Sequence, residues 1–194
     1  YKRQVRFGEG DGALELRIGF SFVSEKNARE NLEAEMLGKS FAEVRSEATA
    51  TWNDLLGRIR VEGGTEREKG LFYSSLYRSF LWPALRSDVN GEFTDVNGKV
   101  VNPGFRYYTG PSYWDDYRNK LILLGMLAPD VAADVISSDT DKGEKRGGFM
   151  PTFFHGDHAS AFVAGTYLRG NRGFDVNRAC LLYTSPSPRD STSS

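Results

Sequence analysis

The hydrophobic periodicity of the chain changes once, near residue 24. From Leu14 to Phe22 apolar side chains alternate with polar or small ones, which is the period of a β-strand with one buried face. From residue 24 to residue 179 the apolar spacing is that of amphipathic helices, except in a long connection at 86–111 and a loop at 142–148. Strands followed by a run of helices predict an α+β chain, mainly α, that contributes to two separate domains.

Residues 1–23 predict a β-hairpin. A short strand around Val5–Phe7 precedes the alternating segment, and the glycine-rich stretch Gly8–Gly12 connects the two. Two strands alone are marginally stable in water. We therefore expect them to belong to a larger sheet whose other strands are not in this chain.

Helix starts are marked by capping residues. Ser24, Ser40 and Thr65 are preferred N-caps, and the last two are followed three positions later by Glu43 and Glu68. A Ser or Thr with Glu at that spacing completes a capping box. The pattern predicts three helices that begin directly after these residues.

The long connection over residues 86–111 contains the pairs Asn90-Gly91 and Asn97-Gly98, which predict a small β-ribbon with type I′ turns. Each pair ends an Asp-Val-Asn-Gly repeat. The repeats lack the Gly and Glu positions of a calcium loop, so we interpret them as turns. Further helices are predicted from Ser112 to about Leu127, after Pro129, and from about residue 157 to 170. A charged, glycine-rich loop is predicted at 142–148.

Composition excludes several classes of partner. The formal net charge is −1, from 25 Lys and Arg against 26 Asp and Glu, and we expect no nucleic-acid partner because phosphate binding needs a basic excess. The longest apolar run, Leu121–Ala128, is far shorter than the roughly 20 residues that a membrane span requires. The single cysteine, Cys180, excludes an internal disulfide.

The segment Ser112–Arg118 opens a predicted helix and places Trp114, Asp115 and Arg118 within about one turn. This set suits a sugar, because an aromatic ring stacks on the C–H face and charged groups bond to neighbouring hydroxyls. Two structural interpretations compete with it. Asp115 fits a capping box with Ser112, and it also fits a surface ion pair with Arg118.

Two other positions are weaker candidates for ligand binding. His155 and His158 are three residues apart, whereas the helical zinc pattern requires His at i and i+4 with a Glu between them. A polar pocket contact or a helix N-cap at Asp157 is favoured over zinc. Asn31 carries an amide oxygen of the kind that calcium accepts, although an isolated helical Asn is usually solvated. No nucleophile, phosphate-loop or dinucleotide motif is present in the sequence.

Several short motifs, taken in order, resemble glycoside hydrolase family 92, the exo-acting α-mannosidases. They are Gly19–Ser24, Asn27–Glu35, Trp52–Leu56, Phe72–Arg78, the Ser-x-Trp-Asp-x-x-Arg pattern at Ser112–Arg118, Gly148–Pro151 and Gly156–Ala159. Each motif is weak alone, but their order and spacing are specific. The resemblance covers nearly all of residues 13–179.

The resemblance implies an N-terminal β-sandwich joined through linker helices to an (α/α)6 barrel. Residues 1–24 would be the last strands of the sandwich, 25–62 the linker helices, and 63–179 the first helices of an incomplete barrel. It further implies an inverting displacement, in which a carboxylic acid protonates the leaving oxygen and a carboxylate activates water. Calcium is the implied cofactor, with Asn31 as a candidate ligand.

Carried onto this chain, the resemblance makes Trp114, Asp115 and Arg118 contacts of the terminal mannose. Asp157 and His158 would line the mouth of the barrel. The general acid, the general base and the other calcium ligands of the family lie downstream of the Gly-Asp-His segment. The resemblance therefore implies a fragment without a complete active site, inactive alone, from a secreted or periplasmic bacterial enzyme that binds mannose-containing glycans.

Two alternatives stay open. Residues 180–194 resemble the translation of a sequencing-library adaptor, and a natural Ser/Pro-rich tail is the other interpretation. The alternative function is a non-catalytic carbohydrate-binding or helical interaction module, with Trp114 and the ribbon as its binding platform.

Overall fold

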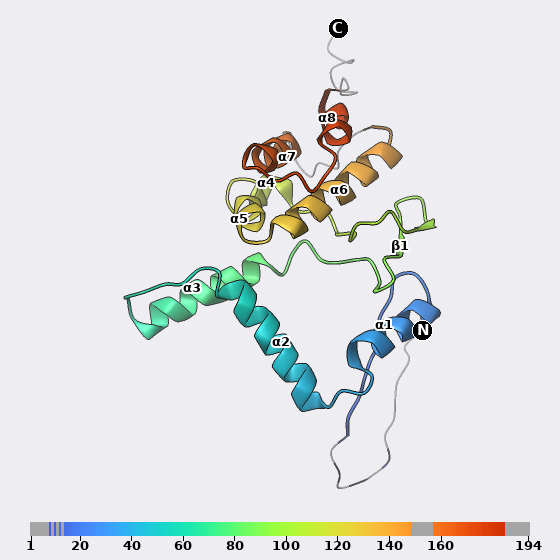
Figure 1. Cartoon of the computed structure of the whole chain (residues 1–194), viewed down its shortest axis with the longest axis vertical. Coiled ribbons are helices and arrows are strands. Elements are labelled where there is room, and N and C mark those ends of the chain that lie inside the picture. Colours follow the sequence, from blue (N-terminus) through green and yellow to red (C-terminus); the bar gives the residue numbers. More distant parts are fainter. Residues whose placement is uncertain (1–7, 9, 11, 13, 149–156, 185–194) are drawn as a thin grey trace.

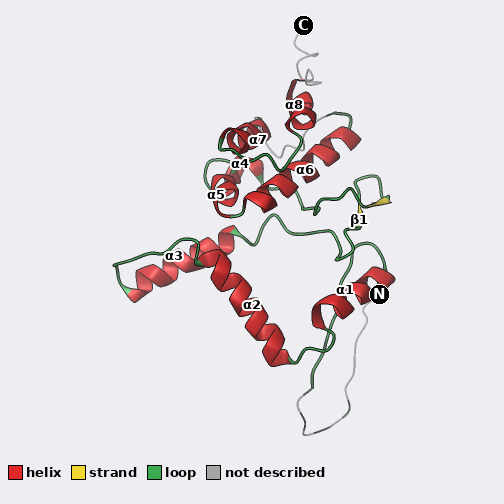
Figure 2. Cartoon of the chain, in the orientation of Figure 1, coloured by secondary structure: helices red, strands yellow, loops and turns green. Residues whose placement is uncertain are grey.

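The structure is a computed structural model that describes residues 8, 10, 12, 14–148 and 157–184. Over these residues the protein is mainly helical with little sheet (Figures 1 and 2). The elements in chain order are α1 (Glu25–Met36), α2 (Phe41–Leu56), α3 (Glu66–Ser79), β1 (Phe93–Thr94), β2 (Val100–Val101), α4 (Tyr113–Asp116), α5 (Lys120–Leu127), α6 (Pro129–Lys145), α7 (His158–Leu168) and α8 (Val176–Thr184). Within the described ranges no helix is both long and apolar enough to cross a membrane.

The three predicted helix starts are confirmed. The Ser24 side chain accepts the hydrogen bond that caps α1. Capping boxes are complete at α2, between Ser40 and Glu43, and at α3, between Thr65 and Glu68. Each box satisfies two backbone donors that a helix start would otherwise leave unpaired, which is why the sequence pattern locates these starts well.

The strand predicted over Leu14–Phe22 does not form among the described residues, which run there as a loop. Its apolar side chains are exposed, between 46% at Phe22 and 69% at Ile18. A strand requires a ladder partner, and the described residues supply none to this segment. The other arm of the predicted hairpin lies outside the described residues.

The predicted ribbon is confirmed, because β1 and β2 pair antiparallel around Asn97-Gly98. The type I′ turns are wrong. The Gly98 amide donates to the Asp95 carbonyl at 3.0 Å and the Asp95 amide donates to the Lys99 carbonyl, which is the pattern of a three-residue loop. The Asp88–Gly91 repeat has the same bonding, and in both turns the glycine takes a positive φ.

The single helix predicted from Ser112 to Leu127 is wrong, because the structure divides it into α4 and α5. Asn119 ends the continuity: its side-chain oxygen accepts the Lys120 amide at 2.6 Å and so caps a new helix. Asparagine competes for backbone hydrogen bonds inside helices and is favoured at their starts.

The loop predicted at 142–148 is also wrong over its first half, because α6 continues to Lys145. Two ion pairs at helical spacing stabilise this end, Asp139 with Lys142 and Asp141 with Lys145. Basic residues in a last turn also interact favourably with the helix dipole. These local ion pairs therefore outweigh the tendency of Gly143 to end the helix.

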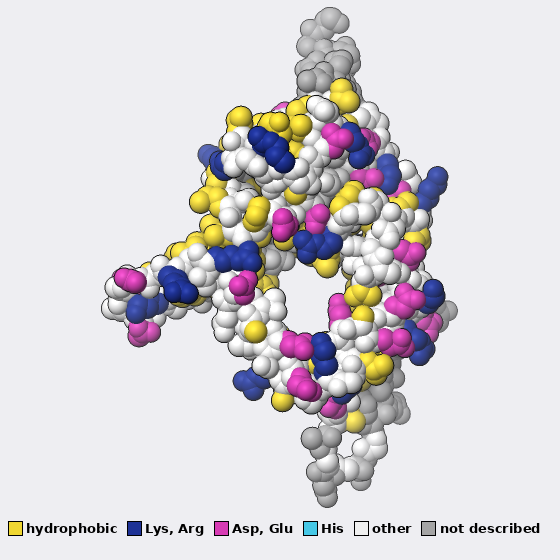
Figure 3. Space-filling view, in the orientation of Figure 1, with side chains coloured by type: hydrophobic (Ala, Val, Ile, Leu, Met, Phe, Trp, Pro, Cys, Tyr) yellow, Lys and Arg dark blue, Asp and Glu magenta, His cyan; other side chains and the backbone are white. Residues whose placement is uncertain are grey.

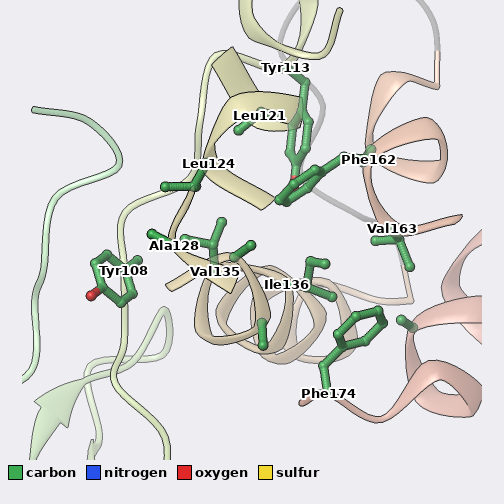
Figure 4. Close-up of a cluster of buried hydrophobic side chains, with 14 of the residues drawn as sticks. Tyr108, Tyr113, Leu121, Leu124, Ala128, Val135, Ile136, Phe162, Val163 and Phe174 are labelled. Carbon is green, nitrogen blue, oxygen red and sulfur yellow. The ribbon is translucent and has the colours of Figure 1, made fainter. Parts of the chain in front are cut away.

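The hydrophobic core lies among α5, α6, α7 and α8, with α6 in the middle of the cluster (Figure 4). Its buried members are Tyr108, Tyr113, Leu121, Leu124, Ala128, Ala132, Ala133, Val135, Ile136, Ala159, Phe162, Val163, Phe174, Ala179 and Leu182. Leu182 shows that α8 runs past residue 180 into the predicted tail. The adaptor origin of residues 180–194 stays a prediction, and 185–194 lie outside the described residues.

The helices before the ribbon contribute little to this core. Helix α2 has no buried residue and α3 has Leu76 alone. Figure 1 shows α2 and α3 extending away from the α4–α8 group. Figure 3 shows an opening through the molecule, which α1, α2 and the connecting loops surround. These elements therefore present their apolar side chains to solvent in this chain.

Candidate functional site

Helix α4 is a single turn that presents the predicted sugar-binding segment. Tyr113 anchors it, because its side chain is buried at 1% exposure and its hydroxyl donates to the Asp139 carboxylate of α6. Trp114 is 48% exposed, and Asp115 and Arg118 are exposed as well. This segment thus holds the Tyr113 side chain in the core and exposes Trp114, Asp115 and Arg118 at the surface.

Neither structural interpretation of Asp115 is realised. Ser112 makes no side-chain cap bond to the backbone of α4, and its hydroxyl instead donates to the Asp115 carboxylate at 2.6 Å. Among the described ion pairs none joins Asp115 to Arg118. The Arg118 guanidinium lies over the Tyr117 ring, 5.1 Å from its centroid. Both charged groups therefore stay at the surface beside Trp114.

The second candidate segment lies at the start of α7, next to the first. Asp157 is the N-cap, as predicted, and its carboxylate accepts the Ser160 amide at 3.2 Å. The His158 ring stacks on the Tyr117 ring with centroids 4.2 Å apart and planes 11° from parallel. This stack brings His158 next to the Ser112–Arg118 segment, since Tyr117 lies 41 positions earlier in the chain.

The zinc interpretation finds no support in the described residues. His155 lies outside them, and within them no group of three or more His, Cys, Asp or Glu side chains could hold a metal ion. His158 uses its ring face for stacking on Tyr117.

A buried ion pair on α6 contacts Tyr113, and the sequence did not predict it. Asp139 is fully buried, and the Lys142 ammonium donates to its carboxylate at 2.7 Å and to the Tyr108 carbonyl at 2.8 Å. Burial raises the pKa of Asp139, and the Lys142 charge and the Tyr113 hydroxyl offset part of that rise. The Asp-x-x-Lys spacing on a helix is the sequence feature that could have predicted this ion pair.

An open pocket of about 410 Å³ lies between the ribbon and the C-terminal half of α6. Tyr107, Lys142 and Gly110 are part of its wall, and Gly110 comes two residues before Ser112. Burial raises the pKa of the Tyr107 hydroxyl, and the carboxylates of α6 raise it further, so this phenol stays protonated. The pocket therefore offers a neutral phenol beside a cation at the base of the candidate segment.

Asp95 attaches the ribbon to α6. Its carboxylate pairs with Lys145 at 3.0 Å and accepts the amides of Asn97 and Lys99, each at 2.9 Å. Lys145 also pairs with Asp141, so one cation bridges two carboxylates. The contact fixes the ribbon beside the pocket.

Asn31, the candidate calcium ligand, is engaged in hydrogen bonds within the chain. Its amide nitrogen donates to the Asp88 carboxylate and to the Phe20 carbonyl, each at 2.7 Å. Its amide oxygen accepts the Val89 amide at 2.9 Å. No described contact therefore places Asn31 near Trp114 or His158. Asn31 lies where α1, the preceding loop and the Asp88 turn meet.

Comparison with known proteins identifies the family. Residues 27–187 match the glycosyl hydrolase family 92 catalytic domain. The chain belongs to glycosyl hydrolase family 92. An uncharacterized secreted glycosidase of Arthroderma benhamiae is 33% identical to this family 92 chain over 87 residues, which are 43% of the chain and 11% of the relative.

Solved structures of family 92 agree with this assignment. A GH92 α-mannosidase from Bacteroides thetaiotaomicron superposes with a TM-score of 0.78 at 28% identity, over 84% of this chain and 23% of its own. A GH92 inverting mannosidase from the same organism gives 0.71 at 28% identity, over 82% and 23%. The family 92 chain therefore spans less than a quarter of the length of these relatives.

Proposed function

We propose that the protein containing this chain is an inverting exo-α-mannosidase that removes terminal α-mannosides from glycans. The match to the family 92 catalytic domain over residues 27–187 is the observation that carries the proposal. Two similar structures support it, since one is an inverting mannosidase and another is an α-mannosidase in complex with mannoimidazole. Mannose-containing glycans are the substrate class that follows.

In the proposed site, the α4 turn contributes to the mannose subsite. The exposed Trp114 ring offers a face for the apolar side of the sugar, while Asp115 and Arg118 bond to hydroxyls. Tyr117 links this turn to His158 through their stacked rings, so Asp157 and His158 would form the adjacent rim. The buried contact of Tyr113 with Asp139 holds the turn in place.

We propose that the chain is inactive alone. Inverting hydrolysis needs an acid and a base about 6.5–9.5 Å apart on opposite faces of the sugar ring. The carboxylates that the structure describes near Trp114 are bonded to Ser112, Lys120 or Ser160, and none is placed by the resemblance in either role. We propose an N-terminal β-sandwich and a complete (α/α)6 barrel for the whole protein. The resemblance places the acid and the base downstream of the Gly-Asp-His segment.

Calcium is proposed as the cofactor of the whole protein on the strength of the family resemblance. The described residues do not fit a calcium site by themselves. They contain no cluster of three or more acidic or His side chains that could hold a metal, and the Asn31 oxygen accepts the Val89 amide. No catalytic step is therefore assigned to calcium.

Secretion or export to the periplasm is proposed for the whole protein. The support is the secreted glycosidase of Arthroderma benhamiae, which matches over 87 residues. This proposal predicts that the parent gene encodes a signal peptide and that the enzyme is recovered outside the cytoplasm of the host.

The proposal is tested with the full-length protein and the isolated chain on a chromogenic α-mannoside. We expect turnover by the full-length protein only, with β-mannose as the first product in a proton NMR time course. Turnover by the isolated chain would contradict the absence of an acid and base. Release of α-mannose first would contradict inversion, and failure on every α-mannoside would contradict the activity.

A non-catalytic carbohydrate-binding module is the second candidate, and the 48% exposure of Trp114 favours it. An exposed aromatic face is sufficient for sugar binding without chemistry. Glycan-array binding by the full-length protein with no hydrolysis of the bound glycans would support this function over the first.

A further inference from the structure

Five residues meet where α1 packs against the loop that leads into β1, and we call this cluster the Asn31 joint. Its members are Phe20, Ser21, Asn31, Asp88 and Val89. They come from three segments: the loop before α1, α1 itself and the first Asp-Val-Asn-Gly turn. Figure 1 shows α1 beside this part of the chain. The joint thus connects the Asp88 turn to two segments that lie 57 or more residues earlier in the sequence.

Asp88 is the acceptor at the centre of the joint. One of its carboxylate oxygens accepts from the Asn31 amide and the other from the Ser21 hydroxyl, both at 2.7 Å. Two further bonds run in parallel between the same segments. Asn27 donates to the Glu92 carboxylate at 2.9 Å, and the Thr94 hydroxyl donates to the Phe22 carbonyl at 3.2 Å.

The surroundings of Asn31 determine which end of its amide faces which partner. The two groups near the nitrogen, a carboxylate and a carbonyl, can only accept, and the group near the oxygen, the Val89 amide, can only donate. Rotating the amide by half a turn would set its oxygen against two acceptors. A calcium ligand would need that oxygen to face the ion, together with other oxygen ligands.

We propose that Asn31 is a positioning residue and not a calcium ligand. It acts through Asp88 and the Phe20 carbonyl, and holds the Gly19–Phe22 loop against the Asp88 turn. The same loop is one wall of an open pocket of about 210 Å³, which Arg86 and Asp88 also line. The consequence for catalysis, that the loop is fixed relative to the ribbon and so to the pocket that Gly110 lines, rests on the proposed function.

The experiment compares variants of the full-length protein. Asn31→Ala removes all three bonds, and Asn31→Asp keeps an oxygen but loses both donors and sets a second carboxylate against Asp88. The swap Asn31→Asp with Asp88→Asn restores one donor and one acceptor between the two positions. Asn53→Asp, on the exposed surface of α2, is the control for the added charge. Each variant is measured for Tm, for calcium Kd by titration calorimetry after chelation, and for kcat/KM at a temperature where all remain folded.

We expect Asn31→Asp to lower Tm and kcat/KM more than Asn31→Ala does. The swap should recover part of both losses, because the donor to the Phe20 carbonyl stays lost, and calcium Kd should be unchanged throughout. A calcium ligand would behave in the opposite way, because aspartate is the stronger ligand: Asn31→Asp would retain or tighten calcium binding and Asn31→Ala would weaken it. Weakened calcium binding in Asn31→Ala, or a swap no better than Asn31→Asp, would overturn the proposal. Failure of the wild type to bind calcium or cleave mannosides would contradict the proposed cofactor or function, while the Tm series would still decide the role of Asn31.

Discussion

Asp139 and Lys142 form a buried ion pair at the base of the candidate site, with side-chain exposures of 0% and 10%. Lys142→Met would leave the carboxylate buried without its counter-charge. Removing one partner of a buried pair costs about 3–5 kcal/mol, and we expect a loss of that size in the free energy of unfolding. Denaturant titration of the full-length protein, followed by circular dichroism, measures it.

The control removes both charges. Asp139→Asn combined with Lys142→Met leaves a neutral acceptor for the Tyr113 hydroxyl, so it should recover most of the lost stability. Equal losses in the single and double variants would show that the pair contributes by packing and not by charge.

Trp114 is the residue on which the mannose subsite proposal depends most directly. Trp114→Ala removes the stacking face, and we expect kcat/KM on an α-mannoside to fall roughly tenfold, which corresponds to about 1.4 kcal/mol. Trp114→Phe should retain most of the activity because it keeps an aromatic face. Leu168→Ala removes an 81% exposed apolar side chain elsewhere and should leave the activity unchanged. If Trp114→Ala behaves like Leu168→Ala, the ring does not contact substrate.

Sequence reasoning at the scale of single residues succeeded where the partner is close in sequence. The caps at Ser24, Ser40 and Thr65 depend on amides three residues later, so the pattern contains both partners. The bonds of Asn31 depend on residues 11 and 57 or more positions away, and no local pattern predicts them. The roles assigned to Trp114, Asp115 and Arg118 stay predictions.

At the scale of elements, the described structure preserves the order of helices and ribbon but changes two boundaries. Asn119 divides one predicted helix, and the ion pairs of α6 extend another into a predicted loop. Both changes have local causes that compete with periodicity: a capping side chain in the first case and charge spacing in the second. The strand predicted over Leu14–Phe22 did not form for a different reason. A strand depends on a partner strand, and periodicity alone does not show whether one is present.

The ribbon and α6 should separate in acid because Asp95 joins them. Burial alone would raise the pKa of Asp95, but the Lys99 and Asn97 amides and the Lys145 ammonium outweigh it, so the pKa lies below its usual value. A lowered folded-state pKa means that the contact stabilises above the ordinary value of about 3.9 and is lost as the pH falls through the folded-state pKa.

Hydrogen-exchange protection of the Asn97 and Lys99 amides measures this contact, because both donate to Asp95. We expect the protection factors to fall at pH values below the usual range of the carboxyl, and Asp95→Asn to show the reduced protection at neutral pH as well. Protection that is independent of pH in the wild type would contradict a role for the ionised carboxylate.

At the scale of the molecule, the chain matches 84% of its own length to under a quarter of a family 92 α-mannosidase. Helices α5 to α8 bury a common core, whereas α2 has no fully buried residue and α3 has Leu76 alone. Amphipathic helices form stable structure chiefly by burying their apolar faces against partners. The difference between the two halves therefore predicts that the second half is the more protected against exchange, and the first half the more dependent on the rest of the protein.

The isolated chain should consequently be poorly soluble. Its exposed large apolar side chains include Leu14, Leu16, Ile18, Phe20, Phe41, Leu71 and Phe72. Contiguous exposed apolar surface of this kind promotes association. Leu14, Leu16, Ile18 and Phe20 alternate along a single segment. We expect size-exclusion chromatography with light scattering to show aggregates of the isolated chain, but a discrete species for the full-length protein. A monodisperse monomer that unfolds cooperatively would contradict this, because it would require the exposed faces of α2 and α3 to be stable in water without the partners that we propose the whole protein supplies.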